Sequence, residues 1–251
     1  MQCYTIKLFF RHYQYYYKKT KQGIVMETIA MIVAAGRGRR AGGKIPKQYE
    51  RSQNERMLSL TIQALLKSTK IDAIIVVINR LDIKLYMDSI KHLNTSRLLN
   101  HCFGGTERTE TVKNGLTELK KYSPKKLLIH DAARPFISVE LIERLLNSLA
   151  KNQAVLPVLP IVDAIWEIDN RESNDFIIKP GPNRANLLLA QTPQGFDYST
   201  ICSAYNHSKK NKLDDVAIAH EAGIKISTVI GDIKTKKITS KEDLAFFKGL
   251  Q

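Results

Sequence analysis

The sequence predicts an α/β fold in which a mostly parallel central sheet is covered by helices on both faces. Short β-branched runs alternate with stretches of helical period from residue 28 to the end of the chain. Several strand-like runs, such as residues 71–79 (IDAIIVVIN), are apolar almost throughout, as is typical of strands buried on both faces. A polar segment at about residues 163–190 carries two prolines and interrupts the alternation. We therefore expect a Rossmann-like three-layer sandwich from which a β-arm projects.

The first half of the chain supplies three predicted strands and two predicted helices. Residues 28–35 (TIAMIVAA) are apolar and partly β-branched, which predicts the first strand, and residues 71–79 predict the second. Residues 97–105 (RLLNHCFGG) predict a third strand that leads into a glycine loop. Residues 57–68 (MLSLTIQALLKS) have the period of a helix, and residues 107–121 repeat apolar side chains on one helical face.

The second half continues the alternation on both sides of the arm. Before the arm, we expect a strand with its turn at residues 125–136, a helix at 139–150 and a strand at 153–168. After the arm, we expect helical segments at residues 197–210, 214–223 and 240–250, with a strand at 226–231.

One domain accounts for most of the chain. Its 251 residues suit a single large α/β domain, which we place at residues 26–251 and which includes the arm. The first 25 residues carry five Lys or Arg and no acid, and they lack an apolar region long enough for a secretion signal. We expect residues 1–25 to be a basic, aromatic extension that is disordered or precedes the native start at Met26.

Charge and cysteine usage indicate the kind of partner and the compartment. The formal net charge of +15 favours anionic partners, among them nucleic acids, membrane surfaces and phosphorylated small molecules. Cys3, Cys102 and Cys202 are too far apart for a disulfide framework or a metal knot, which suits a reducing cytoplasm. No run approaches the ~20 apolar residues of a membrane span, so we expect no membrane partner.

A basic glycine loop, GRGRRAGGKIPKQY at residues 36–49, follows the first predicted strand. It partly fits a P-loop, but Ile45 stands where that motif needs a Ser or Thr for magnesium. It also partly fits a dinucleotide fingerprint, but Gly42, Gly43 and Pro46 prevent the helix that should follow. A solvated basic turn is the remaining structural alternative. Because ligands bind beyond the carboxyl ends of strands in open α/β sheets, we favour a loop that binds a triphosphate.

Several sequence blocks together resemble one family. AAGRGRR (34–40) with PKQY (46–49) resembles the signature of nucleotidyltransferases that join a nucleoside triphosphate to a phosphate monoester. Further blocks, in order and spacing, are similar to those of the 2-C-methyl-D-erythritol 4-phosphate cytidylyltransferases. They are GGTERTETVKNGL (104–116), HDAARPF (130–136), AQTPQGF (190–196), DD (214–215) and KKITSKEDL (236–244). The resemblance extends from about residue 29 to residue 250.

This resemblance implies a reaction and a set of partners. CTP and methylerythritol phosphate would give the CDP-linked alcohol and pyrophosphate with Mg²⁺, as a step of the non-mevalonate pathway to isoprenoids. Catalysis of such a transfer consists mainly of positioning and fixed positive charge, so the protein needs no nucleophile. The resemblance also implies a homodimer whose arms interlock, so that each arm serves a site shared between subunits.

The resemblance assigns roles position by position. Arg40, Lys47, Arg184 and Lys237 would be the catalytic cations. Nucleotide binding would involve Ala34, Ala35, Gly36, Gly38, Gly105, Thr106, Thr111, Asp131 and Ala132. The sugar-phosphate substrate would contact Asp131, Arg134, Arg184, Thr192 and Lys237. Asp131 is also the candidate magnesium ligand, with most of the coordination coming from the triphosphate, and His130 is expected to be structural.

The chain departs from the family pattern at two positions near the substrate. Ala164 and Leu213 stand where the family usually has threonine, so two hydroxyls that help to hold the sugar phosphate are absent. Losing one or two hydrogen bonds, each worth ~0.5–1.5 kcal/mol, weakens binding without abolishing chemistry. A cytidylyltransferase for another sugar-alcohol phosphate, such as ribitol 5-phosphate, is therefore the first alternative.

Two alternatives lie in other classes. A basic nucleic-acid-binding protein would use the net charge and the aromatic, basic stretch RHYQYYYKK near the N-terminus to stack bases. A catalytically inactive relative would act as a scaffold. Because Arg40, Lys47 and Asp131 are all present, we favour an enzyme, and we expect no nucleic-acid partner.

Overall fold

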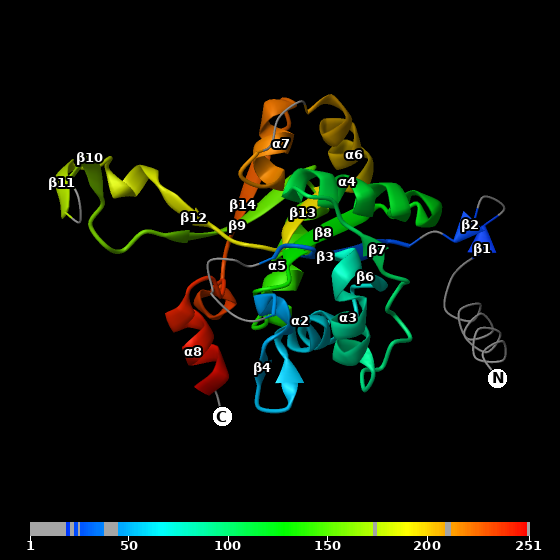
Figure 1. The fold of residues 1–251 in the computed structure, drawn as a ribbon. Coiled ribbons are helices and arrows are strands. Elements are labelled where there is room, and N and C mark those ends of the chain that lie inside the picture. The colour runs from blue at the N-terminus through cyan, green and yellow to red at the C-terminus, as the bar shows by residue number, and fades with distance from the viewer. Residues whose placement is uncertain are drawn as a thin grey trace.

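The computed structural model of the chain describes residues 19–20, 23–24, 26–37, 45–172, 175–208 and 212–249. These residues form an α/β fold with a mostly parallel central sheet, as predicted (Figure 1). The expected extension at residues 1–25 lies largely outside the described residues. Within it, β1 (Lys19–Thr20) pairs antiparallel with β2 (Gly23–Ile24).

The central sheet has eight strands and is mixed rather than wholly parallel. Along its main path the order is β12-β9-β13-β8-β3-β6-β7, and β14 pairs with β9. The strands β3, β6, β7 and β8 run parallel to one another, whereas β12 and β13 are antiparallel to their neighbours. The bounds are β3 (Thr28–Ala34), β6 (Ala73–Ile78), β7 (Cys102–Phe103), β8 (Lys126–Asp131), β9 (Ala154–Pro160), β12 (Leu188–Ala190), β13 (Gln194–Asp197) and β14 (Ile226–Ile230).

Two groups of helices cover the two faces of this sheet (Figure 1). The side chains of β3 alternate between them, with Ile32 in the cluster on one face and Met31 in the cluster on the other. The first face is covered by α2 (Met57–Leu66), α3 (Ile83–Ile90) and α5 (Val139–Leu149). The second face is covered by α4 (Arg108–Leu119), α6 (Tyr198–His207) and α7 (Asp215–Glu221).

The C-terminal helix packs beside the sandwich rather than on either face of the sheet. Helix α8 (Lys241–Gly249) buries Leu244 and Phe247 in a small cluster with Met57 and Ala133. A hairpin of β4 (Arg51–Ser52) and β5 (Glu55–Arg56) lies beside it. The short 3₁₀ turns are η2 (Lys47–Tyr49), η3 (Arg80–Asp82), η4 (Lys120–Tyr122), η5 (Arg184–Asn186) and η6 (Ile233–Thr235).

The predicted arm projects from the sandwich as a two-stranded hairpin (Figure 1). Strands β10 (Trp166–Glu172) and β11 (Asp175–Pro180) pair antiparallel and form a sheet of their own. Large apolar side chains on the arm are exposed, among them Trp166 at 56% and Phe176 at 59%. The last part of the predicted arm returns to the body of the protein, because β12 pairs with β9.

The structure differs from the sequence prediction in several elements. Helix α3 was not predicted, and the strand expected at residues 97–105 is reduced to β7, with one further bridge between Leu98 and Ile74. The single strand expected at residues 153–168 is two strands, β9 and the first part of β10. Strand β13 was also missed, because its four residues are too few to show a period.

No helix in the described part of the chain combines the length and the apolar composition needed to cross a bilayer.

Helix α4 lies so close to β3 that its glycine has no room for a side chain. A Cβ on Gly115 would collide with the sulfur of Met31 and lie 3.0 Å from Cγ2 of Val77, and both side chains are fully buried. In an open helix, Gly→Ala stabilises by ~1 kcal/mol. We expect Gly115→Ala instead to lower the free energy of unfolding by about 1–3 kcal/mol, because overpacking outweighs helix propensity.

Urea denaturation would measure this change. Gly249→Ala is the matched control, because a Cβ at that α8 position meets nothing within 4 Å. Equal midpoints for the two variants would show that the α4–β3 contact can relax at no cost.

Candidate active site

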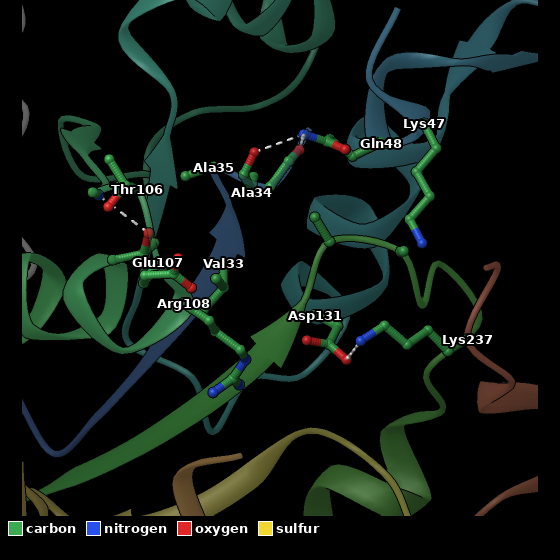
Figure 2. A pocket seen from close by; sticks show the side chains of 15 residues that line it. Val33, Ala34, Ala35, Lys47, Gln48, Thr106, Glu107, Arg108, Asp131 and Lys237 are labelled. Carbon is green, nitrogen blue, oxygen red and sulfur yellow. Dashed lines mark hydrogen bonds and ion pairs between the residues drawn. The ribbon is translucent and has the colours of Figure 1, made fainter. Parts of the chain in front are cut away.

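A cleft of about 230 Å³ lies where β3 and β8 end (Figure 2). Segments far apart in the sequence meet there: the chain after β3, the loop between β7 and α4, the turn after β8, and single lysines from η2 and from the segment after η6. The lining residues are Val33, Ala34, Ala35, Gly36, Lys47, Gln48, Gly105, Thr106, Glu107, Arg108, Thr111, Asp131, Ala132, Ala133 and Lys237. This is the carboxyl end of the parallel strands, where α/β folds place their ligands.

A buried glutamine holds the chain that leaves β3. Nε2 of Gln48 donates to the carbonyl oxygens of Ala34 at 2.7 Å and of Gly36 at 2.9 Å (Figure 2). Gln48 itself is 4% exposed, so its amide has little water to compete for these bonds. The start of the glycine loop therefore has a fixed path, with Ala35 and Gly36 facing the cleft.

The loop between β7 and α4 forms the opposite wall and is held by side chains of α4. The N–H of Gly105 donates to Oγ1 of Thr111 at 3.2 Å, and the N–H of Thr106 donates to Oε2 of Glu110 at 2.8 Å. Glycine is required at residue 104, because a Cβ there would come within 2.5 Å of Cβ of Ala35. The close approach brings the two main-chain walls together.

The carboxylate of Asp131 lies between these walls and two cationic side chains. Its Oδ2 is 2.9 Å from Nζ of Lys237 and 3.4 Å from Nε of Arg134. Burial alone would raise the pKa of Asp131, but three positive charges hold it well below its ordinary range. Those charges belong to Lys237, Arg108 and Arg134. Asp131 is therefore ionised at neutral pH.

Behind Asp131, two polar side chains link β8 to the turn before β13. The hydroxyl of Thr192 accepts the N–H of Asp131 at 3.1 Å and lies 3.0 Å from Nδ1 of His130. Nε2 of His130 is 3.0 Å from the carbonyl oxygen of Arg134. The carbonyl can only accept, so the neutral imidazole carries its proton on Nε2 and Nδ1 accepts from Thr192. His130 is fully buried and structural in its contacts, as the sequence predicted.

The segment after η6 brings both lysines of the cleft together. Nζ of Lys47 donates to the carbonyl oxygen of Ile238 at 2.7 Å, and the N–H of Ile238 donates to the carbonyl oxygen of Ala133 at 2.9 Å. Nη1 of Arg134 donates to the carbonyl oxygen of Thr235 at 2.7 Å. These bonds fix residues 235–238 against the turn that follows β8, so that Lys237 faces Asp131 (Figure 2).

Most of the predicted residues meet at this cleft, but some lie elsewhere. Lys47, Lys237, Asp131 and all but one of the predicted nucleotide contacts line it. Arg134 and Thr192 are buried beside Asp131 rather than in the lining. Arg184 lies in η5 on the arm, where it is exposed and donates to the carbonyl of Val162, so within one chain it does not line the cleft. Gly38 and Arg40 lie outside the described residues, and their roles stay predictions.

Sequence reasoning missed five lining residues: Val33, Gln48, Glu107, Arg108 and Ala133. Arg108 forms a two-pronged ion pair with Asp215, at 2.8 Å and 2.6 Å. Burial would lower the pKa of Arg108, but the facing carboxylate raises it overall, so the guanidinium remains charged. The adjacent acids at residues 214–215 stood out in the sequence, but the sequence alone assigned neither of them a partner or a role.

The cleft offers few ligands of its own for a metal ion. No group of three or more His, Cys, Asp or Glu side chains lies close enough to form a metal site among the residues that the structure describes. Both ion pairs of Asp131 use Oδ2, so Oδ1 is the oxygen suited to a metal ion. This donor set fits a magnesium ion that takes most of its ligands from a bound triphosphate and water.

The family model described as "IspD: 2-C-methyl-D-erythritol 4-phosphate cytidylyltransferase" matches residues 28–249. The bifunctional enzyme IspD/IspF of Paramagnetospirillum magneticum is 39% identical over 219 residues, which cover 87% of this chain and 55% of that protein. The protein of the same description from Maricaulis maris is 37% identical over 219 residues, with the same two coverages. The chain thus spans about half the length of these relatives.

Solved structures resemble the fold over most of its length. The 4-diphosphocytidyl-2C-methyl-D-erythritol synthase of Anaerococcus prevotii has a TM-score of 0.74 and 28% identity, and the match covers 89% of this chain and 97% of that one. The 2-C-methyl-D-erythritol 4-phosphate cytidylyltransferase of Thermus thermophilus has a TM-score of 0.69 and 25% identity, with coverages of 89% and 98%.

The buried histidine behind Asp131 makes stability depend on pH. Burial lowers the pKa of His130 from 6.5 to about 4, so between these values the unfolded chain binds a proton that the folded chain does not. Lowering the pH through this window favours the unfolded chain, by about 3 kcal/mol for this group. Urea titrations at pH 7 and pH 4.5 would measure this effect. We expect the free energy of unfolding to fall less between these two pH values in His130→Asn than in the unaltered protein. Parallel pH profiles would mean that folding does not lower the pKa of His130.

Proposed function

Because the chain belongs to the IspD family of 2-C-methyl-D-erythritol 4-phosphate cytidylyltransferases, we propose that it transfers the cytidylyl group of CTP to 2-C-methyl-D-erythritol 4-phosphate, in isoprenoid precursor biosynthesis. One observation of the structure supports this reaction in particular. The cleft combines two main-chain walls suited to a nucleotide with an ionised carboxylate and two lysines suited to phosphate groups. Family membership favours this enzyme over a nucleic-acid-binding protein.

The reaction needs alignment and positive charge more than acid–base groups. A phosphate oxygen of the acceptor attacks the α-phosphorus of CTP and forms the new P–O bond, while the bond to the β-phosphate breaks and pyrophosphate leaves. A phosphate monoester is largely ionised at pH 7, so the acceptor needs no strong general base. Lys47 and Lys237, held by Ile238 and Asp131, supply fixed charges for the phosphoryl oxygens.

The main-chain walls suit the nucleoside part of CTP. A pyrimidine presents a small edge of hydrogen-bond donors and acceptors. The carbonyl oxygens of Gly105 and Thr106 and the hydroxyl proton of Thr111 can match it, since the two N–H groups already bind side chains of α4. The chain at Ala34–Gly36 forms the other wall of the cleft, and the carbonyl oxygen of Val33 just before it accepts the N–H of Ala132. A base between the two walls would leave its triphosphate directed toward Lys47.

Magnesium belongs to the proposal as a cofactor. When bound, it would neutralise part of the triphosphate charge and favour the departure of pyrophosphate. Asp131 is the side chain of the cleft that would hold it, together with phosphate oxygens and water.

The arm and the cysteines support two further parts of the proposal. An isolated two-stranded hairpin is marginally stable in water, and this one exposes Trp166, Ile168 and Phe176, which favours a homodimer in which the arm is covered. Arg184 on that arm would then serve the cleft of the second subunit. The free thiols Cys102 and Cys202 are compatible with the proposed cytoplasmic location.

Pyrophosphate release from a panel of nucleotides and acceptors tests the function. With Mg²⁺ and methylerythritol phosphate, we expect CTP to give a kcat/KM at least ~10-fold above those of UTP, ATP and GTP, because walls fitted to one base reject the others. We also expect methylerythritol phosphate to exceed ribitol 5-phosphate as the acceptor. Equal rates with all four nucleotides, or a preference for ribitol 5-phosphate, would overturn the corresponding part of the proposal.

Subunit mixing tests whether Arg184 acts across a dimer. Arg184→Ala and Lys47→Ala homodimers should each be nearly inactive. If they are mixed after reversible dissociation, half of the molecules are heterodimers with one intact site, so about a quarter of the native activity should return. The control mixes Lys47→Ala with Lys237→Ala, which line the cleft of the same chain and should therefore recover nothing. If the test pair recovers no more activity than the control, Arg184 serves the site of its own subunit.

A further inference from the structure

Two adjacent acids at the start of α7 connect opposite sides of the cleft. Asp214 and Asp215 differ in what they bind, although they are neighbours in sequence. Neither Asp214 nor Asp215 lines the cleft, so neither side chain takes a direct part in the reaction.

Asp215 binds Arg108, on the nucleotide side of the cleft. It is fully buried, and both of its carboxylate oxygens accept from the guanidinium of Arg108. Its Oδ1 also accepts the hydroxyl proton of Tyr205, from α6. A fully buried carboxylate with donors on both oxygens has a fixed orientation, so it fixes the guanidinium that it faces.

Arg108 is the first residue of α4 and directly follows the loop wall at Gly105–Glu107. That wall is bonded to Thr111 and Glu110 of the same helix, so it moves together with the first turn of α4. The ion pair with Asp215 anchors this turn to α7, a part of the fold 107 residues away in sequence. In Figure 2 the side chain of Arg108 extends away from Thr106 and Glu107, along the side of the cleft where Asp131 lies.

Asp214 instead faces the other side. Its Oδ1 accepts the N–H of Ala217 at 2.9 Å and caps α7, and its Oδ2 accepts from Nε2 of Gln194 at 2.9 Å. Gln194 follows the turn that carries Thr192, whose hydroxyl accepts the N–H of Asp131. Through Gln194 and Thr192, Asp214 is thus connected to Asp131, on the side of the cleft where the acceptor phosphate would bind.

We propose that Asp215 is a positioning residue for the nucleotide: through its ion pair with Arg108 it fixes the first turn of α4 and, with it, the wall that receives the base. Tyr205 orients the carboxylate from behind. The inference rests on the proposed function, since it names how the nucleotide side of the same cleft is held. It gives Asp215 no contact with the substrate and no part in the chemical step.

Direct binding of CTP in the presence of Mg²⁺, measured by calorimetry, tests the inference apart from turnover. Asp215→Asn keeps the size of the side chain but replaces one acceptor oxygen with a donor that Arg108 cannot use. We expect the Kd for CTP to rise about tenfold or more, and the KM for CTP to rise in parallel while the KM for the acceptor phosphate changes less than about twofold.

Asp214→Asn is the matched control, because it makes the same chemical change one residue earlier. Both variants should lower the melting temperature, but only Asp215→Asn should weaken CTP binding. If Asp215→Asn is not recovered as a folded protein, Asp215→Glu retains the charge and displaces the guanidinium by one methylene, and it should also weaken CTP binding.

Three outcomes are decisive. Unchanged or tighter CTP binding in a folded Asp215 variant overturns the inference. Equal weakening in both Asn variants also overturns it, because the effect would then be general loss of structure. If the unaltered protein itself binds no CTP, the proposed function fails first, and that result is recognised before any variant is compared.

Discussion

The carboxylate of Asp131 is a buried negative charge at the end of β8, and the arrangement of the whole cleft follows from keeping it there. A buried charge without partners is strongly unfavourable, so Lys237 and Arg134 must lie beside it and Arg108 must lie near it. Each of these cations is in turn held by another element. Arg134 binds the carbonyl of Thr235, and Arg108 binds Asp215, so the end of η6 and the start of α7 both lie against the same strand end.

The two sides of the cleft are built on different physical principles. On the nucleotide side, the main chain after β3 and the main chain before α4 face each other, and Gln48, Thr111 and Glu110 fix their paths from behind. On the phosphate side, long cationic side chains reach in and are held by protein acceptors; the carbonyl of Ile238 is one that holds Lys47. Rigid peptide groups suit the flat edge of a base, while charges held in place on long side chains suit phosphate oxygens, where negative charge develops during transfer.

The fold could be predicted from sequence wherever burial imposes a pattern. The strand β6 is apolar throughout because both of its faces are covered, and the run IIVV is therefore unambiguous. Helix α3 escaped prediction because it buries only Tyr86 and Ser89, too few residues to show a helical period. Likewise, the family resemblance pointed to Asp131 and Lys237, whereas the pair of Arg108 with Asp215 could not be found. Those residues are 107 positions apart, and only the packing of α4, α6 and α7 brings them together.

Glycine at residue 104 lets one stretch of peptide approach another, and this has an evolutionary consequence. Every amino acid except proline supplies the same N–H and C=O groups, so a wall made of them is indifferent to most side-chain replacements on its outer surface. Genetic drift can therefore rewrite much of the surrounding sequence while leaving that recognition surface chemically identical. The constraint falls on the few positions where a methyl group would block the approach, and such positions are the ones to follow when distant homologues are aligned.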